Sequence, residues 1–521
     1  LRGQIEIGRD EALNVRLIAD WSEFNSGNRT IRPLDNLGMA ETLGALPLPK
    51  FGQTRNNLDS RENWEFWGVT LLVDYQINDN LTLSSVSGYK TYETDFLFNT
   101  DGTEIDITRS NFQYDTEQFS QELRLDGRWK RFDFLLGGYY LNEDKQGALG
   151  LIRANIDRTF IIPNDDTVDA LAAFGLLTFR ATDRLSLVAG VRYSYEKKKD
   201  FTSIGAIFGG DFLNGLDSFD PVTVFSTRSD KDSWNDVSPR FLVQYDVSDK
   251  VNVYGSVTKG FKSGGWNAFT AEASFDPEKV WSFEIGGRSE FMDGRMRLNV
   301  TAFYYDYSDL QVTTTLNNLT VTTNAAEATN KGLEVELVAR PVPAWLVGVS
   351  ASYLDAEYDR FLSPFGICPV NATAEEIAGP CNGAAPGQTR TFDLSGNTLT
   401  NAPEGKFNIR SQYDFDLGGD GVVSVFGQVS YQSRVFYTQF NEDIIGQDGF
   451  ALVDARLSYT SPDERWNLAF LAKNIFDKDY FQNVVRFTST SDPAKDRFSI
   501  GNALGYPAPG RSFSAQVRFY Y

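Results

Sequence analysis

Histidine is absent from this chain of 521 residues, and cysteine occurs only at Cys368 and Cys381. The absence of histidine excludes a His-based catalytic triad, a His-ligated zinc site and an imidazole general base. No P-loop, GxGxxG or GxSxG motif stands in the strand–turn–helix context that its chemistry requires. We therefore expect no enzymatic activity, no cofactor and no resident metal.

Long apolar runs are missing as well. No stretch approaches the roughly 18–20 consecutive apolar residues that a membrane helix needs. This excludes a helical membrane protein but leaves room for a membrane β-barrel, whose strands expose only alternate side chains to lipid. Positive charge is also scarce, with 49 Lys and Arg against 70 Asp and Glu and a net charge of −21. Nucleic acid is therefore not an expected partner.

The two cysteines lie close together in one expected loop. A disulfide between Cys368 and Cys381 would stabilise the fold by about 3 kcal/mol on the chain-entropy model, and it fits an oxidising compartment. The spacing is too wide for a CxxC metal site. We predict a disulfide here.

Aromatic residues, in contrast, are abundant at 14%, with 40 Phe and 23 Tyr. They take part in a period-two alternation that runs through the whole chain. In its last nine residues, one face carries Phe513, Ala515, Val517, Phe519 and Tyr521, and the other carries polar residues and Tyr520. Such alternation predicts a strand with one apolar face, which needs an apolar surrounding such as lipid.

The same pattern recurs in Leu13–Trp21, Phe119–Trp129, Leu298–Tyr304 and Ala451–Tyr459. The second face of these strands carries charges, and charges need water or polar partners. We expect that face to line a wet lumen, with ion pairs across neighbouring strands. The charged residues expected there are Glu122, Asp126, Glu334, Glu336, Arg124, Arg128 and Arg340.

Short and long connections alternate strictly in the expected strand order. The short ones are Gly8–Glu11, Asn78–Asn80, Lys130–Arg131, Ala181–Arg184, Ser248–Lys250, Met292–Arg295, Pro341–Pro343, Asp416–Gly421 and Ser461–Glu464. The long ones are Asn25–Asn63, Asn99–Asp115, Gly147–Thr167, Thr202–Ser233, Ser263–Asp276, Asp359–Thr400 and Asn483–Gly510. This asymmetry places all turns at one end of a sheet, as in outer-membrane barrels with periplasmic turns and extracellular loops.

The expected fold class is therefore all-β, a large antiparallel transmembrane barrel occupying residues 1–521 as one domain. About 19 strands are present, and three more would complete a barrel of 22 strands, the number of the large plugged transporters. Leu1 is not a start methionine, so we expect the first strands to lie upstream in a longer chain. A propeller is disfavoured because its blades would repeat at a constant period of roughly 40–45 residues.

Two segments resemble signatures of the TonB-dependent outer-membrane receptor family. The first runs from Gly260 and Phe261 through Lys262, Gly264, Gly265 and Trp266, and continues at 275–286. The second is Asn474–Tyr480 and contains Phe476 and Asp477. The resemblance implies import of a scarce solute across the outer membrane of a Gram-negative bacterium. An N-terminal plug, pulled through a TonB box by the partner TonB, is also implied, and neither is present in these residues.

The resemblance gives a ferric siderophore as the first candidate solute. A carbohydrate, a cobalamin-like compound or an aromatic compound is the alternative, and a passive porin or structural barrel is a further one. Other expected partners are outer-membrane lipid, lipopolysaccharide and the barrel-assembly machinery, for which Phe519 and Tyr521 would serve as the C-terminal signal. We expect a monomer and leave open a surface lipoprotein partner.

Some side chains are candidates for contact with the solute. Lys262 and Trp266 would lie near the rim of the lumen, where Gly264 and Gly265 permit positive φ and a sharp exit into the loop. The alternative is a rim turn whose lysine pairs with a carboxylate. The long loop 202–233 carries Phe208, Phe212 and Phe219, which could grip an aromatic solute or form a small satellite core. Asn474 and Asp477 are expected to organise a tight bend through local backbone bonds.

Overall fold

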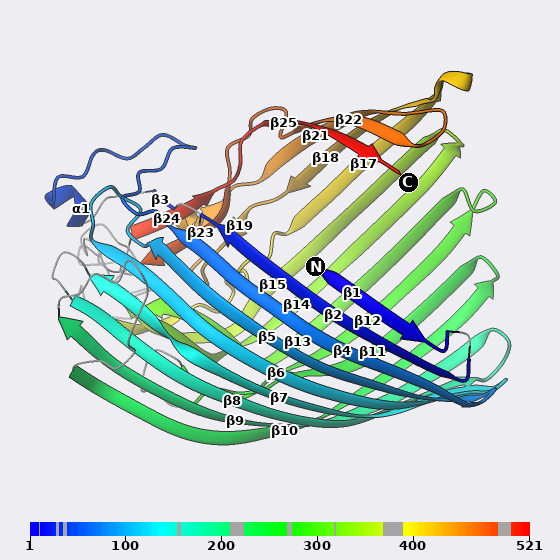
Figure 1. Ribbon diagram of the computed structural model, residues 1–521, viewed down its shortest axis with the longest axis horizontal. Coiled ribbons are helices and arrows are strands. Elements are labelled where there is room, and N and C mark those ends of the chain that lie inside the picture. The colour runs from blue at the N-terminus through cyan, green and yellow to red at the C-terminus, as the bar shows by residue number, and fades with distance from the viewer. Residues whose placement is uncertain are drawn as a thin grey trace.

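The alternating segments form strands of one large antiparallel sheet (Figure 1). The computed structural model describes residues 1–9, 11–27, 31–34, 39–153, 158–208, 223–267, 274–316, 319–367, 389–487 and 502–520. None of the helices formed by these residues is long and apolar enough to cross a membrane. The α-helix found there, α1, spans only Met39–Thr42.

The main sheet contains 20 strands, and all but the short β16 (Thr389–Asp393) pair successively in chain order. These strands are β1 (Arg2–Ile7), β2 (Leu13–Ser26), β4 (Arg61–Asn78), β5 (Leu81–Asn99), β6 (Thr108–Arg128), β7 (Phe132–Arg153), β8 (Arg158–Arg180), β9 (Leu185–Phe208), β10 (Thr223–Ser248), β11 (Val251–Lys262), β12 (Glu278–Phe291), β13 (Met296–Leu316), β14 (Leu319–Val342), β15 (Trp345–Ile367), β17 (Gly405–Asp416), β18 (Val422–Gln432), β21 (Phe450–Thr460), β22 (Trp466–Lys473) and β25 (Ser512–Phe519). The expectation of about 19 antiparallel strands is thus confirmed. β16 pairs with the far part of β15.

The sheet has two free edges. β1 pairs with β2, and β25 pairs with β22, but β1 and β25 do not pair with each other in the described part of the chain. Backbone pairing among these residues therefore curls the sheet without closing it. We call the interval between β1 and β25 the seam.

The tight hairpins gather at one end of the sheet and the longer connections at the other (Figure 1). We call these the turn end and the loop end. Two small sheets lie among the connections of the loop end. One pairs β19 (Val435–Phe436) with β20 (Gly446–Gln447), and the other is formed by β3 (Arg32–Pro33), β24 (Asn502–Pro507) and β23 (Phe481–Phe487).

All nine expected turns are confirmed by the strand boundaries. The expected strict alternation of short and long connections is wrong. At the loop end only two residues separate β13 from β14, and β7 and β8 continue to Arg153 and from Arg158, well into the expected loop 147–167. These strand extensions carry buried apolar residues at consecutive positions, such as Ala148 with Leu149 and Ile161 with Ile162, so the period-two alternation could not reveal them.

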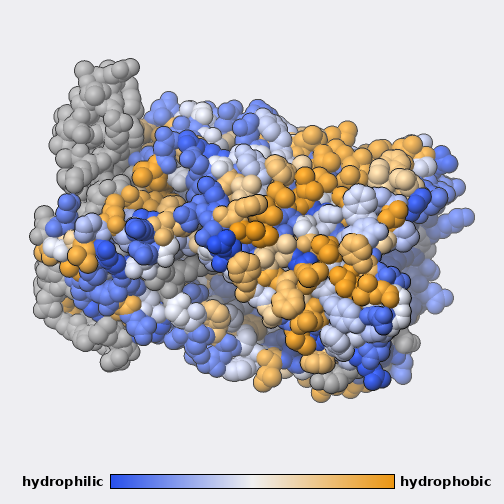
Figure 2. Space-filling view, turned by 90° about the horizontal axis from the view of Figure 1, so that it is seen from above, coloured by the Kyte–Doolittle hydropathy of each residue, from blue (hydrophilic) through white to orange (hydrophobic). Residues whose placement is uncertain are grey.

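Apolar side chains face outward along the strands and leave the middle of the sheet without a dry core. Leu123 is 52% exposed, Ile285 67% and Val517 55%. The buried clusters are small and include Val312 with Phe361, and Ile445 with Val484. Figure 2 shows hydrophobic residues gathered in a band between hydrophilic ends. A broad exposed apolar band on a curled antiparallel sheet indicates contact with lipid.

A charge on this band should destabilise the fold strongly. Ile285 lies on the outward face in the middle of β12, and an Ile285→Lys substitution should cost about 2–4 kcal/mol in a lipid bilayer, as for other midplane cations on barrels. The control is Ser256→Lys, on the inner face opposite Glu284, where we expect a change below about 1 kcal/mol. Urea unfolding in lipid vesicles, followed by tryptophan fluorescence, gives both values. Equal costs would contradict the assignment of faces.

Candidate functional site

The segment Ser263–Asn267 leaves β11 at the loop end and is fixed against β13 and β14. The side-chain amide of Gln311 donates to the backbone carbonyls of Ser263 (2.9 Å) and Asp276 (3.0 Å). The Asn267 side chain donates to the Thr322 carbonyl (3.1 Å) and accepts from its N–H (2.6 Å). We call residues 263–267 the clasp, because these bonds bridge the tops of non-adjacent strands.

On its other side the clasp contacts β9. The Lys198 ammonium donates to the Gly264 carbonyl at 3.0 Å and forms an ion pair with Glu196 at 3.0 Å. The Ser263 hydroxyl donates to the same Glu196 carboxylate. One lysine and one glutamate thus hold the start of the clasp to the inner wall.

The glycines of the clasp are required by close packing. A Cβ on Gly264 would lie 2.4 Å from the Phe275 carbonyl oxygen and 2.6 Å from the Trp234 ring, and one on Gly265 would lie 2.9 Å from the Phe275 ring. Neither glycine has a positive φ, so the expectation of a left-handed exit is wrong. The Trp266 ring meets the Trp234 ring edge-on at 5.7 Å. The motif therefore places the Trp266 and Trp234 rings in contact at the loop end of the sheet, which forms the mouth of the lumen.

Arg228 on β10 forms the most buried ion pair of this region. Its guanidinium donates from Nε to Asp200 on β9 (2.8 Å) and from Nη1 to the Asn267 carbonyl at the end of the clasp (2.9 Å). The Arg228 and Asp200 side chains are only 8% and 6% exposed. Thr202 donates to the second Asp200 oxygen at 3.0 Å. Satisfied hydrogen bonds of this kind offset the cost of burying both charges.

Asp166 on β8 stands directly opposite Asp200 and opposite Lys145 on β7. It lies beyond Leu171, the last apolar residue on the outward face of β8, and therefore outside the membrane-spanning part. Asn164 donates to its carboxylate at 2.7 Å. Burial, and then the neighbouring Asp200 carboxyl, raises the pKa of Asp166 to about 7. Asp166 thus favours holding a proton near neutral pH.

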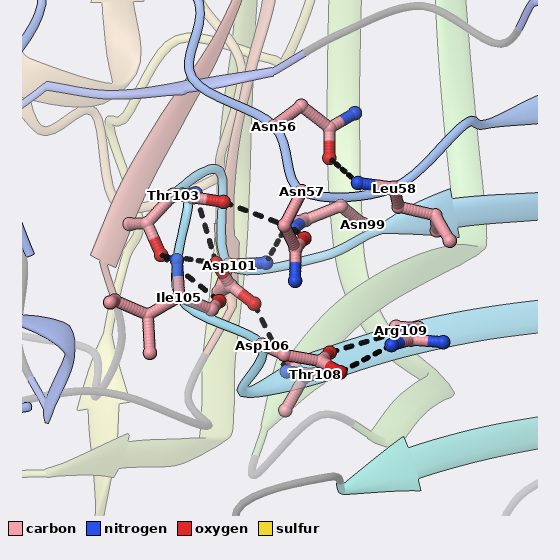
Figure 3. A network of polar contacts seen from close by, with 10 residues as sticks. All are labelled: Asn56, Asn57, Leu58, Asn99, Asp101, Thr103, Ile105, Asp106, Thr108 and Arg109. Carbon is pink, nitrogen blue, oxygen red and sulfur yellow. Dashed lines mark hydrogen bonds and ion pairs between the residues drawn. The ribbon is translucent and has the colours of Figure 1, made fainter. Parts of the chain in front are cut away.

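The connection between β5 and β6 is a closed polar loop (Figure 3). The Asp101 carboxylate accepts bonds from the Thr103 N–H (2.9 Å), the Thr103 hydroxyl (2.6 Å) and the Thr108 N–H (3.0 Å). Asn99 accepts from the N–H groups of Asp101 (2.9 Å) and Gly102 (2.7 Å). These donors occupy the carboxylate, so its role is to order the loop.

No group of three or more acidic, cysteine or histidine residues suited to a metal exists in the described part of the chain.

Contacts at the loop end join the two sides of the seam. The connection from β2 to β4 contributes β3, and the connection from β22 to β25 contributes β23 and β24. Leu504 pairs with Pro33, and Gly505 pairs with Arg32. Leu34 packs on the buried Ile445, Val484 and Ala503 cluster. We call this sheet and its small core the bridge.

The inner wall is polar and carries a groove from β12 to β21. Its lining includes Arg288, Thr301, Glu334, Lys406, Asn408, Gln432 and Tyr480. Within the described residues, the charged residues expected to pair across strands form no ion pair between strands. Arg124 pairs with Glu122 two residues away on the same strand at 3.3 Å, and Glu336 accepts from Asn299 on β13 at 3.1 Å. Same-strand pairing arises because inward side chains two residues apart share one face.

The second motif forms the predicted tight bend. The Asn474 side chain donates to the Lys478 carbonyl (2.9 Å) and accepts from the Lys478 N–H (2.8 Å). Asp477 accepts from the Arg511 N–H at 2.7 Å, which fixes the start of β25. Asn474 and Asp477 both have positive φ. Phe476, between them, is 77% exposed.

The candidate solute contacts are only partly brought together. Lys262 is exposed at the end of β11 and makes no ion pair with any residue that the structure describes. A pair with a lumen carboxylate is therefore not found there, and a pair with a plug carboxylate stays a prediction. Trp266 is half-buried against Trp234. The remaining candidates, namely the Phe208 side chain, Phe212, Phe219, Cys368, Cys381 and Tyr521, lie outside the described residues. Their proposed roles stay predictions.

The sequence did not single out Arg228, Asp200, Asp166 or Gln311, whereas Asn267 closes the first family-signature segment. Each stands at an inward or loop position where polar residues are common, and only the strand register brings them together. The one available signal was charge in the upper parts of β8–β10. That signal was interpreted as solvated loop.

An outward apolar band, a polar inner wall and an ordered mouth at one end define a large β-barrel of the outer-membrane type. The model of the family "TonB dependent receptor-like, beta-barrel" matches residues 6–475. The chain belongs to this family of Gram-negative outer-membrane barrels.

Sequence relatives match shorter stretches. The pesticin receptor of Yersinia pestis is 28% identical over 198 residues, which cover 37% of this chain and 27% of the receptor. The ferripyoverdine receptor of Pseudomonas aeruginosa is 23% identical over 271 residues, covering 49% and 29%. The matches therefore span less than a third of each relative.

A solved structure extends the likeness to the whole sheet. The ferric yersiniabactin uptake receptor FyuA from Yersinia pestis superposes with a TM-score of 0.76 and 18% identity. The match covers 99% of this chain and 70% of FyuA. At this identity it establishes the shared fold.

Enlarging Gly264 should loosen the clasp. A Gly264→Ala substitution puts a methyl group against the Phe275 carbonyl and the Trp234 ring, and overpacking of this kind costs about 1–3 kcal/mol. Gly427→Ala is the control, because a Cβ there meets nothing within 4 Å. The urea midpoint of the purified protein should fall for the first variant only. A Gly264→Ala midpoint equal to that of the control would show that the clasp tolerates the methyl group.

The carboxyl pair should make stability depend on pH. The pKa of Asp166 is about 7 in the folded state and near 3.8 in the unfolded state. Its contribution to folding stability is therefore fully present below pH 3.8 and is lost as the pH rises through 7. Asp166→Asn should therefore flatten the decline in thermal midpoint between pH 5 and pH 8. The control is Asp165→Asn, at an exposed neighbouring position. An unchanged profile in Asp166→Asn would refute the assignment.

Proposed function

We propose that this chain is the barrel of a receptor that imports a ferric siderophore across the outer membrane with energy from TonB. The main observation that supports this proposal is the family match over residues 6–475. The names of the relatives add the substrate class, since the ferripyoverdine receptor and the ferric yersiniabactin uptake receptor both handle ferric chelates. Because the matched stretches are partial, the substrate of this chain is inferred by analogy.

The mouth supports capture of a bulky polar solute. Lys262 ends β11 and Trp266 lies in the clasp that follows it, and Lys198 lies 5.8 Å from the Trp234 ring centroid as a cation over an aromatic face. Aromatic faces and cationic groups suit chelates that combine rings with negative charge. The inner groove with Arg288 and Lys406 continues this polar lining along the wall.

The energy for uphill import must come from a partner. The sequence carries no nucleotide-binding motif, so the chain has no visible means of using nucleotide energy. Coupling to TonB requires a plug and a TonB box, which we propose as further parts of the receptor. A solute path would then open when the plug moves within the polar inner wall.

The test is uptake by cells. Deletion of the gene should abolish accumulation of one labelled ferric siderophore from a panel under iron limitation, and a plasmid copy should restore it. Uptake should also stop when TonB is removed or the proton-motive force is collapsed. A Trp266→Ala variant should raise the apparent KM, whereas Phe476→Ala, in the second motif, should leave it unchanged.

Other outcomes discriminate the alternatives. Loss of growth on a carbohydrate, a cobalamin-like compound or an aromatic compound, with normal iron uptake, would keep the receptor and change the substrate. Sugar entry into vesicles containing the full gene product, without TonB, would indicate a passive porin instead.

A further inference from the structure

Three lysines form a cluster on the outer surface of the upper wall. Lys197 and Lys199 lie on β9 and Lys231 lies on β10, where Lys199 stands directly opposite Lys231. All three share the outward face with Tyr193 and Val237, which are 46% and 52% exposed. The lysine face therefore continues the lipid-facing side of the sheet.

The height of the cluster corresponds to lipid headgroups. Outward residues of β9 are apolar or aromatic up to Tyr195, and the next two are Lys197 and Lys199. Lys197 stands four residues beyond Tyr193, roughly 13 Å along the strand. Aromatic girdles mark the border of the hydrocarbon, so side chains one or two steps beyond them meet headgroups.

The carboxylate directly opposite Lys197 and the inner-face carboxylates near the cluster are engaged elsewhere. Asp169 stands opposite Lys197, but it accepts hydrogen bonds from the Tyr140 hydroxyl (3.3 Å) and the Asn142 amide (3.1 Å). Asp200 and Asp230 belong to the inner face and pair with Arg228. Within the described residues none of the three lysines forms an ion pair.

The positive charge of the lysine cluster contrasts with acidic outward residues at the same height on four other strands. On β2, β4, β5 and β6 the outward residues above the aromatic girdle are Glu23, Glu65, Glu93 and Asp115, each directly opposite the next. A chain with a net charge of −21 thus places three unpaired cations together at one position of its headgroup zone. Charge complementarity points to an anionic group of the membrane.

We propose that Lys197, Lys199 and Lys231 bind the phosphate groups of an anionic lipid in the leaflet at the loop end. Three ammonium donors within two neighbouring strands match the several oxygens of a phosphorylated headgroup. The Tyr193 and Tyr195 side chains below them contact the start of the acyl chains. The site holds lipid against β9 and β10, whose inner faces carry Lys198, Asp200 and Arg228, and it is independent of the transported solute.

The experiment compares lipid retention by variants of the full gene product. The protein is exchanged into phosphatidylcholine nanodiscs containing a minor fraction of diphosphorylated lipid A, and bound lipid is counted by native mass spectrometry after release. A triple Lys197→Gln, Lys199→Gln, Lys231→Gln variant should lose affinity for lipid A by about fivefold per lysine removed. A triple Lys→Arg variant should retain it. Heat-modifiable migration on a gel checks that each variant folds.

A matched control removes three lysines elsewhere. Lys130→Gln, Lys250→Gln and Lys478→Gln lie in connections away from the cluster and should leave lipid A retention unchanged. Equal loss in both triple variants would overturn the proposal, because net charge alone would then explain binding. Inorganic phosphate at the same phosphate concentration should not compete, and full competition would reduce the cluster to a general anion patch. Retention of phosphatidylcholine as strong as that of lipid A would also refute it.

Discussion

The fold depends on a single constraint, which is that every backbone N–H and C=O in the hydrocarbon must find a partner within the sheet. Strands satisfy this only by pairing with neighbours, so the ladder from β1 to β25 sets the positions of everything else. Alternate side chains then divide automatically between lipid and lumen. Above the membrane the same pairing continues without the lipid, and it carries the polar extensions that hold Arg228, Asp200 and Asp166.

Much of the fold could be predicted from the sequence because lipid imposes a period on it. The number of strands, all nine turns and the outward faces of Leu123 and Val517 followed from alternation and turn chemistry. The upper strands could not be predicted in this way, since lipid does not impose its period there and consecutive apolar residues such as Ile161 and Ile162 are buried. Residues 147–153, 158–167, 202–208 and 223–233, all expected in loops, therefore proved to be strand.

The site was only partly predictable for a different reason. The bend at Asn474 and Asp477 followed from local side-chain bonding. The clasp depends on contacts across long sequence separations, such as Asn267 with Thr322 and Lys198 with Gly264. The Phe275 carbonyl and the Trp234 ring leave no room for a side chain at Gly264, and this need for a glycine is visible only once the strand register is known.

The bridge has a mechanical consequence for the rest of the molecule. Leu504 and Gly505 pair with Pro33 and Arg32, so the β2–β4 and β22–β25 connections, on opposite sides of the seam, are joined at their tips. A force that lifts or spreads these connections is transmitted to both free edges at once. The paired tips of the two connections therefore move together as one mechanical unit.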